Sequence, residues 1–260
     1  IGNVWKFPYL CGQMGGAAFI LIYLVFLLIM GVPVMICEFA IGRGSHFSVA
    51  AAFEKLEPEG TRWHISKWIG ILGSYLLMMF YTSVGGWMMY YCFRSIRGDF
   101  VGNSAEEVGA KFTKMLADAP NMAFWTILIC VIGFAICWFG IQNGIEKVSK
   151  VMMSVLMVLM IILAVHSVFL KGAGAGIRFY LIPDFRKMAE IGIGNVIFGA
   201  MSQAFFTLSI GIGAMMIFGS YLERNRSLAG EALSITGLDT FVALMAGFII
   251  IPACFAFGIE

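Results

Sequence analysis

The chain has 260 residues, of which 60% are hydrophobic and 12% are charged, and its formal net charge is +2. A soluble domain of this length carries about 25% charged residues, so the composition excludes an ordinary soluble protein, and the small net charge gives no reason to expect a nucleic-acid partner. Apolar runs of about 20 residues recur, long enough to cross a hydrocarbon core of roughly 30 Å. We therefore predict an all-α, polytopic membrane helical bundle.

Seven membrane segments are predicted, counting a partial one at the start. In chain order they are a short amphipathic segment to about residue 13, spans at about 17–41, 68–95, 121–140 and 147–170, an interrupted span at 189–220, and a last span at 228–257. Between them we expect a turn at 14–16, a surface helix around 48–56, a polar loop at 97–120 with modest helical patterning, a tight connection at 142–146, a glycine-rich loop from about 171 to 187 and a charged hairpin at 223–226.

The stretch 203–213 places hydroxyls, an amide and two helix-weakening glycines in the middle of a membrane-length segment. In hydrocarbon an unpaired backbone polar group costs several kcal/mol, so irregular backbone persists there only where it lines a cavity or binds something. Residues 1–8 hold a second such interruption. Two interrupted spans predict a solute and ion site near the bilayer midplane, and they favour a transporter.

Two carboxylates lie inside apolar spans. Asp239 would cost about 2.5–3.5 kcal/mol at such a depth, so it is expected to face a partner or a cavity. Asn3, Thr207 and Asp239 supply amide, hydroxyl and carboxylate oxygens, which a hard cation prefers. The alternative is a protonated Asp239 that hydrogen-bonds to a neighbouring helix. For Glu38 we expect a buried brace that hydrogen-bonds to loose backbone.

Tyr81 places a phenolic hydroxyl in mid-membrane, and such a group needs a partner when it is buried. Together with Phe206 and Ser209 it is expected to form part of the solute site, whereas a lone tyrosine would be a satisfied core residue.

The sequence shows no catalytic set. His46, His64 and His166 share no motif, and the glycine-rich stretch 172–176 lacks both the following Lys-Ser/Thr and the preceding strand of a phosphate loop. We therefore expect a protein that is not an enzyme.

Several motifs, taken together and in order, closely resemble the neurotransmitter:sodium symporter family, and in particular its bacterial amino-acid transporter branch. They are Gly2-Asn3-Val4-Trp5-Lys6-Phe7-Pro8-Tyr9, Gly15-Gly16-Ala17-Ala18-Phe19, Gly31-Val32-Pro33 with Glu38 and Gly42-Arg43, Asn143-Gly144-Ile145-Glu146-Lys147, and Gln203 to Gly213. The resemblance implies the LeuT-type fold of two inverted five-helix repeats. The chain would run from the outer half of helix 1 through helix 7, as a single transporter domain (residues 1–260) truncated at both ends.

The resemblance also implies roles for individual residues. It implies a sodium site formed by Asn3, Thr207 and Asp239. It implies a substrate site formed by Gly2, Leu77, Tyr81, Phe206, Ser209 and Ile212. It implies gates at Lys6, Gln203 and Tyr221. Asp239 stands where several relatives carry Asn, and Ala243 lacks the hydroxyl of a chloride ligand, so chloride is expected not to be required.

The function implied is sodium-coupled symport of a hydrophobic or neutral amino acid across the cell membrane by alternating access. The partners implied are the amino-acid substrate, the lipid bilayer and a second copy in a homodimer. Two alternatives stay open: a non-transporting solute sensor of the same fold, and a symporter of an amine or osmolyte.

Overall fold

A computed structural model describes residues 2–140 and 145–259, which form helices and turns and contain no strand. The chain divides into two compact units, one formed by Ile1–Ser74 with Met157–Glu260 and the other by Tyr75–Leu156. Most of the tight connection expected at 142–146, including Asn143 and Gly144 of the family motif, lies outside the described residues.

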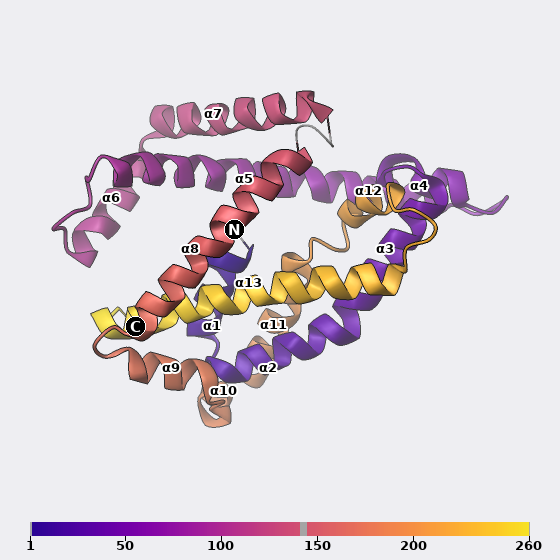
Figure 1. Ribbon diagram of the computed structural model, residues 1–260. Coiled ribbons are helices and arrows are strands. Elements are labelled where there is room, and N and C mark those ends of the chain that lie inside the picture. Colours follow the sequence, from indigo (N-terminus) through magenta and orange to yellow (C-terminus); the bar gives the residue numbers. More distant parts are fainter. Residues whose placement is uncertain (1, 141–144, 260) are drawn as a thin grey trace. The chain divides into compact units, whose positions relative to one another are not determined.

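The first unit contains the discontinuous helices and the last long span (Figure 1). Its elements are the π-helix η1 (Gly2–Lys6), α1 (Phe7–Gln13), α2 (Ala17–Phe26), the π-helix η2 (Leu27–Gly31), α3 (Val32–Ser45), α4 (Val49–Leu56), the 3₁₀ turn η3 (Trp63–Ile65), the start of α5 (Ser66–Ile96), the end of α8 (Lys147–Val168), α9 (Ala173–Leu181), α10 (Phe185–Ile191), α11 (Ile193–Thr207), α12 (Ala214–Ser220) and α13 (Leu228–Phe257).

The second unit contains the rest of α5 and α8 together with α6 (Ala105–Ala117) and α7 (Ala119–Trp138). The start of α6 follows from its sequence. The Ser104 hydroxyl accepts from the backbone N–H of Glu107, and the Glu107 carboxylate accepts from the backbone N–H of Ser104, which is a complete capping box.

Five helices in the described part of the chain are long and apolar enough to cross a membrane. They are Ala17–Ser45, Trp63–Ile96, Ala119–Trp138, Lys147–Val168 and Leu228–Phe257. The predicted spans are therefore confirmed to within a few residues, and the two remaining segments are the shorter helices η1 with α1 and α11 with α12. The chain is a multi-pass membrane protein.

Two glycines allow α3 and α12 to pack backbone against backbone. A Cβ atom at Gly219 would lie 2.7 Å from the Phe39 carbonyl oxygen, and one at Gly42 would clash with the Met216 carbonyl oxygen. In a membrane, where burial of apolar side chains gives little drive for helix association, small residues permit the close approach that dispersion contacts need. This contact fixes α12 against the long helix that carries Glu38.

An aromatic cluster holds the start of the chain against α2. The Phe7 ring lies 5.1 Å from the Tyr23 ring, and Phe19 stacks on Tyr23 at 6.3 Å between centroids. All three side chains are fully buried. The cluster therefore positions η1, which immediately precedes Phe7, and with it Asn3.

Two expectations about local structure were wrong. The glycine-rich segment expected as a loop from 171 to 187 is largely helical, because it forms α9 and the start of α10. Its glycine at position 176 is used for packing, since a Cβ there would lie 2.7 Å from the Pro252 Cα. The irregular backbone expected in residues 1–8 is also not seen from Gly2 onward, where a π-helix leads directly into α1.

Candidate functional site

The predicted interruption of the sixth membrane segment is confirmed. Helix α11 ends at Thr207, α12 begins at Ala214, and the chain between them is not helical (Figure 1). Ser209 has a φ of +52° and Gly211 a φ of +88°, so the backbone enters the left-handed region that side chains other than glycine seldom occupy. At Gly213 a Cβ would also lie 2.6 Å from the Val49 side chain.

Glu38 satisfies the loose backbone of this interruption. Its Oε1 accepts from the Gly211 backbone N–H at 2.6 Å, and its Oε2 accepts from the Met215 backbone N–H at 3.0 Å. The first amides of a helix have no intrahelical acceptor, and a buried carboxylate supplies one. The interpretation of Glu38 as a buried brace is confirmed.

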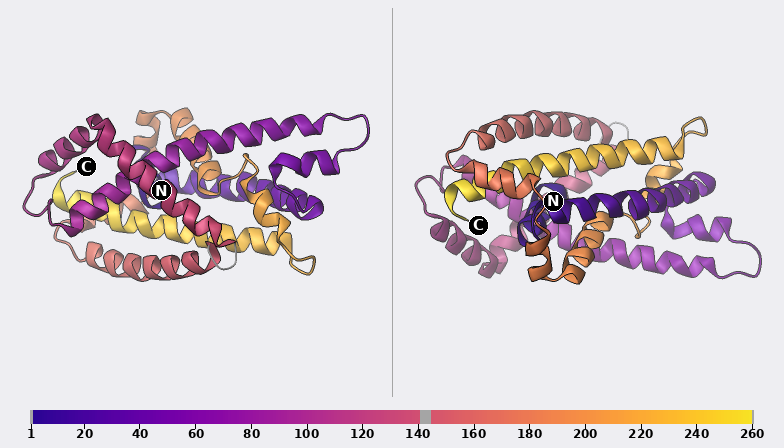
Figure 2. Two further views of the ribbon diagram at one scale, coloured as in Figure 1. Left: turned by 90° about the horizontal axis from the view of Figure 1, so that it is seen from above. Right: turned by 90° about the horizontal axis from the view of Figure 1, so that it is seen from below.

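Three helices bring Asn3, Thr207 and Asp239 together. The Asn3 Nδ2 donates to Asp239 Oδ1 at 2.6 Å and to the Asp239 carbonyl oxygen at 3.1 Å. The Thr207 hydroxyl lies 2.8 Å from Asp239 Oδ2 and also contacts Asn3 Oδ1. These residues come from η1, from the last residue of α11 and from the unbroken α13, which runs as one continuous helix in both views of Figure 2.

The proton count of this cluster points to a missing positive charge. The Thr207 hydroxyl has one hydrogen, yet it faces two acceptors, Asn3 Oδ1 and Asp239 Oδ2. One of the two contacts therefore joins oxygens with no hydrogen between them, which is repulsive in a low-dielectric site. A cation, or a proton on Asp239, relieves that repulsion, and all the ligands on offer are oxygens of the kind that hard cations select.

Four residues predicted for the substrate site and its gate also gather here. The Gln203 Nε2 donates to the Gly2 carbonyl oxygen at 3.2 Å. Gly2 lies against the Phe206 ring, since a Cβ on Gly2 would be 3.4 Å from it. The Lys6 ammonium lies 3.6 Å from the centroid of the same ring, which is a cation–π contact.

The other predicted residues lie in different places. Ser209 is in the interruption, and Ile212 packs beside the start of α5, where a Cβ on Gly73 would lie 2.9 Å from it. Leu77 and Tyr81 are one turn apart on α5, in the Tyr75–Leu156 unit. The predicted gate residue at position 221 follows α12 and is 67% exposed.

Sequence reasoning missed two buried hydroxyls in the membrane segments. The Tyr23 hydroxyl lies beside Thr207 and Thr240, and the Thr236 hydroxyl oxygen and Gln203 Oε1 have no hydrogen-bond partner within the described part of the chain. The last two groups each need a water, an ion or a further polar group. Tyr23 could have been found by the argument used for Tyr81, because its hydroxyl also lies inside an apolar span.

Comparison with known proteins agrees with this architecture. The fold is that of a multi-pass helical membrane protein with a discontinuous helix beside an oxygen-rich cluster. The sequence profile described as the Sodium:neurotransmitter symporter family matches residues 1–108 and 106–257. The chain belongs to this family, so it is a member of a membrane transporter family of the cell membrane.

Individual relatives come from bacteria and animals. The uncharacterized sodium-dependent transporter YhdH of Bacillus subtilis is 35% identical over 265 residues, covering 100% of this chain and 56% of that protein. The sodium-dependent serotonin transporter of Drosophila melanogaster is 29% identical, over 96% of this chain and 45% of that protein. The crystal structure of MhsT in complex with L-phenylalanine matches with a TM-score of 0.90 and 39% identity, over 99% of this chain and 57% of that one. The chain thus spans about half the length of the relatives it matches.

Proposed function

We propose that this chain forms part of a sodium-coupled symporter that moves a hydrophobic or neutral amino acid across the cell membrane by alternating access. The observation that carries the proposal is the cluster of Asn3, Thr207 and Asp239. In it the Thr207 hydroxyl has one hydrogen but faces two acceptor oxygens, Asn3 Oδ1 and Asp239 Oδ2. Two relatives support it: YhdH, which is named a sodium-dependent transporter, and MhsT, which was crystallised with L-phenylalanine.

Sodium is the cation proposed for this cluster, and it is carried as cargo. One carboxylate with neutral amide and hydroxyl oxygens balances a single positive charge. No group of three His, Cys, Asp or Glu side chains that could hold a metal ion occurs in the residues that the structure describes. A sodium ion here would neutralise Asp239 and attract the carboxylate of an amino acid bound beside it.

The substrate would lie next to this ion. We assign its carboxylate to the Gly2 backbone and the Tyr81 hydroxyl, and its closing lid to Phe206. Leu77, Ser209 and Ile212 would surround the side chain, and two aliphatic walls with one small hydroxyl suit an apolar side chain. We treat residues 1–260 as one transporter domain.

Lys6 and Gln203 are proposed for the outer gate and Tyr221 for the cytoplasmic one. The contact of Lys6 with the Phe206 ring supports a link between the gate and the lid. Lysine is a point charge and cannot make the bidentate contacts of arginine, so this gate would be held less firmly than an arginine gate.

Chloride is proposed not to be required. The fixed charge of Asp239 does the work that a chloride ion would do beside sodium, and Ala243, one turn later on α13 and fully buried, offers no hydroxyl to an anion. Relatives such as the sodium- and chloride-dependent GABA transporter 2 of Mus musculus (27% identical) are named for both ions. The homodimer implied by the family stays a prediction.

The test is uptake of labelled leucine, tryptophan, alanine and phenylalanine by the full-length protein in proteoliposomes. Uptake should require inward sodium, should persist when gluconate replaces chloride, and should be lost in Asp239→Ala. Glu59→Ala, which removes an exposed loop carboxylate, is the matched control and should transport normally. Sodium-dependent binding without uptake would favour the solute sensor. Sodium-driven uptake of amines or osmolytes instead of amino acids would favour the other alternative.

A further inference from the structure

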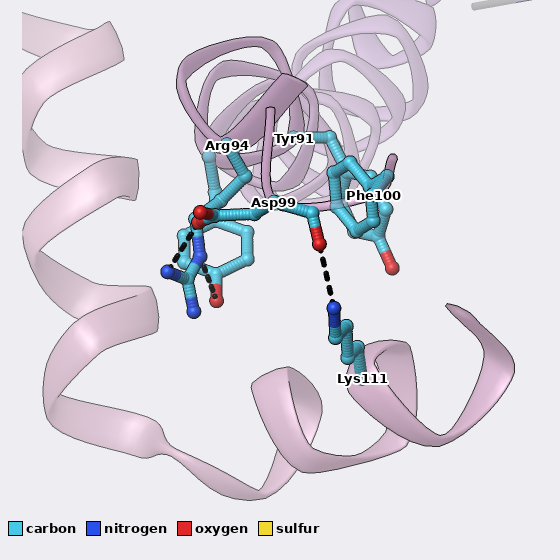
Figure 3. Close-up of a pocket in the computed structure, with 6 residues that line it drawn as sticks. Tyr91, Arg94, Asp99, Phe100 and Lys111 are labelled. Atoms are coloured by element: carbon cyan, nitrogen blue, oxygen red, sulfur yellow. Dashed lines mark hydrogen bonds and ion pairs between the residues drawn. The ribbon is translucent and has the colours of Figure 1, made fainter. Parts of the chain in front are cut away.

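Two adjoining cavities lie in the Tyr75–Leu156 unit, at the end of α5. Their volumes are about 250 and 570 Å³, and Tyr90, Arg94 and Lys111 line both. Figure 3 shows the smaller cavity, with Arg94 and Lys111 among the residues around it. The walls come from the last turns of α5, the loop that follows it, α6 and the start of α7. No residue proposed for transport lines either cavity.

The cavities lie at the ends of two helices that are long and apolar enough to cross a membrane. Helices α5 and α7 are both membrane-length, and the cavities lie where α5 ends and α7 begins. Tyrosine and tryptophan gather at membrane–water interfaces because one part of the ring system is apolar and another part is polar. Tyr90, Tyr91 and Trp125 have this position and this chemistry.

The charges that line the cavities leave positive groups available. Arg94 pairs with Asp99 at 2.5 Å, whereas the Asp118 carboxylate accepts only from the Asn121 backbone N–H and keeps its charge, so three cations face two carboxylates. Lys111 donates to the Asp99 carbonyl oxygen at 2.6 Å and keeps two further N–H groups. Lys114 has no hydrogen-bond or ion-pair partner among residues 2–140 and 145–259.

The larger cavity has an apolar wall beside these cations. In this wall Phe93 packs on Trp125 at 5.5 Å between ring centroids, and Phe124, which does not line the cavity, meets the same indole edge-on at 5.5 Å. Phe93 is 45% exposed and Phe124 is 59% exposed. Cationic donors next to exposed aromatic rings form a surface that is amphipathic over a short distance.

We propose that these cavities bind the headgroup of an anionic phospholipid. Lys111, Lys114 and the remaining N–H groups of Arg94 receive the phosphate, and Phe93 and Trp125 lie along the glycerol and the first acyl carbons. Three cations against two carboxylates leave an excess of one positive charge, so an anionic headgroup is favoured over a zwitterionic one. A free phosphate would use the cations and leave the aromatic wall without a ligand.

The experiment is a lipid titration of the full-length protein in detergent, read by native mass spectrometry. Dioleoyl-phosphatidylglycerol is compared with dioleoyl-phosphatidylcholine, and inorganic phosphate is added as a competitor at constant ionic strength. The test variant is Lys111→Gln with Lys114→Gln. Its matched control is Lys55→Gln with Lys171→Gln, which removes the same charge at exposed positions away from the cavities. Lys111→Arg with Lys114→Arg keeps the charge if the glutamine variant fails to fold.

The unaltered protein should retain phosphatidylglycerol over phosphatidylcholine. The glutamine variant should bind phosphatidylglycerol about 30-fold more weakly, from roughly fivefold per cation at a membrane surface, while the control and the arginine variant keep their affinity. Equal retention of the two lipids, or an equal loss in the control, would overturn the proposal. Displacement of the lipid by inorganic phosphate would overturn it too, because the ligand would then be a soluble anion.

Discussion

Removing the Glu38 carboxylate should destabilise the interrupted segment more than any surface substitution. The carboxylate accepts from the backbone N–H groups of Gly211 and Met215 at 2.6 and 3.0 Å, and Glu38 is only 4% exposed. A buried donor left without an acceptor costs about 1–3 kcal/mol. Glu38→Ala leaves both of these N–H donors without an acceptor and should lower the free energy of unfolding by about 2–6 kcal/mol. Glu38→Gln keeps one acceptor oxygen and should lose about half of that.

Two measurements on the full-length protein in detergent check this prediction. Thermal unfolding gives the loss of stability, and hydrogen exchange should speed up at both the Gly211 and Met215 amides in Glu38→Ala and at one of them in Glu38→Gln. The matched control is Glu54→Gln, which breaks a surface pair with Lys67 at 3.1 Å and should cost about 0–1 kcal/mol. The reasoning would be refuted if both Glu38 variants matched this control in stability and left the exchange of the two amides unchanged.

Three further predictions concern the packing, the ion site and a surface loop. Gly42→Ala pushes a methyl group into the backbone of α12 and should cost about 1–3 kcal/mol in thermal unfolding, whereas Gly237→Ala, which meets nothing within 4 Å, should be tolerated. Thr207→Val should raise the sodium concentration for half-maximal uptake by about tenfold, whereas Thr207→Ser, which keeps the hydroxyl, should leave that concentration nearly unchanged. An equal rise in both variants would argue against a hydroxyl ligand. The His64 backbone N–H holds the pKa of Glu57 below its usual 4.5, so the bond stabilises the folded state above pH 4.5 and this contribution is lost as the pH falls through the lowered pKa. The difference in melting temperature between the unaltered protein and Glu57→Gln should therefore shrink in acid, and a constant difference would contradict this.

The membrane spans could be predicted from sequence because hydrocarbon imposes one strong rule on long apolar runs. The interruption before α12 could be predicted for the same reason, since glycines and hydroxyls are conspicuous in mid-membrane. The grouping of Asn3, Thr207 and Asp239 was different: they lie far apart in sequence, and their oxygen chemistry and the family resemblance linked them. Hydropathy alone would have left Asp239 with an unnamed partner.

What could not be predicted depends on contacts between distant segments. The glycine-rich segment before α10 looked like a loop, yet Gly176 packs on Pro252 and the Tyr180 hydroxyl donates to the Leu244 carbonyl oxygen at 2.9 Å, and both partners are on α13. Local propensity was overridden by that docking. The contact of Lys6 with the Phe206 ring is likewise a property of the folded chain.

The two carboxylates in the membrane segments show how partners, rather than burial, separate bracing from ion binding. Both are costly in hydrocarbon. Glu38 faces backbone N–H donors from the interrupted segment, so hydrogen bonds already balance its charge and an added cation would have to displace them. Asp239 accepts from the amide of Asn3. The Thr207 hydroxyl has one hydrogen for two acceptors, Asp239 Oδ2 and Asn3 Oδ1. The first site is complete without a ligand and the second is not, which is why a cation is expected to bind at Asp239 and not at Glu38.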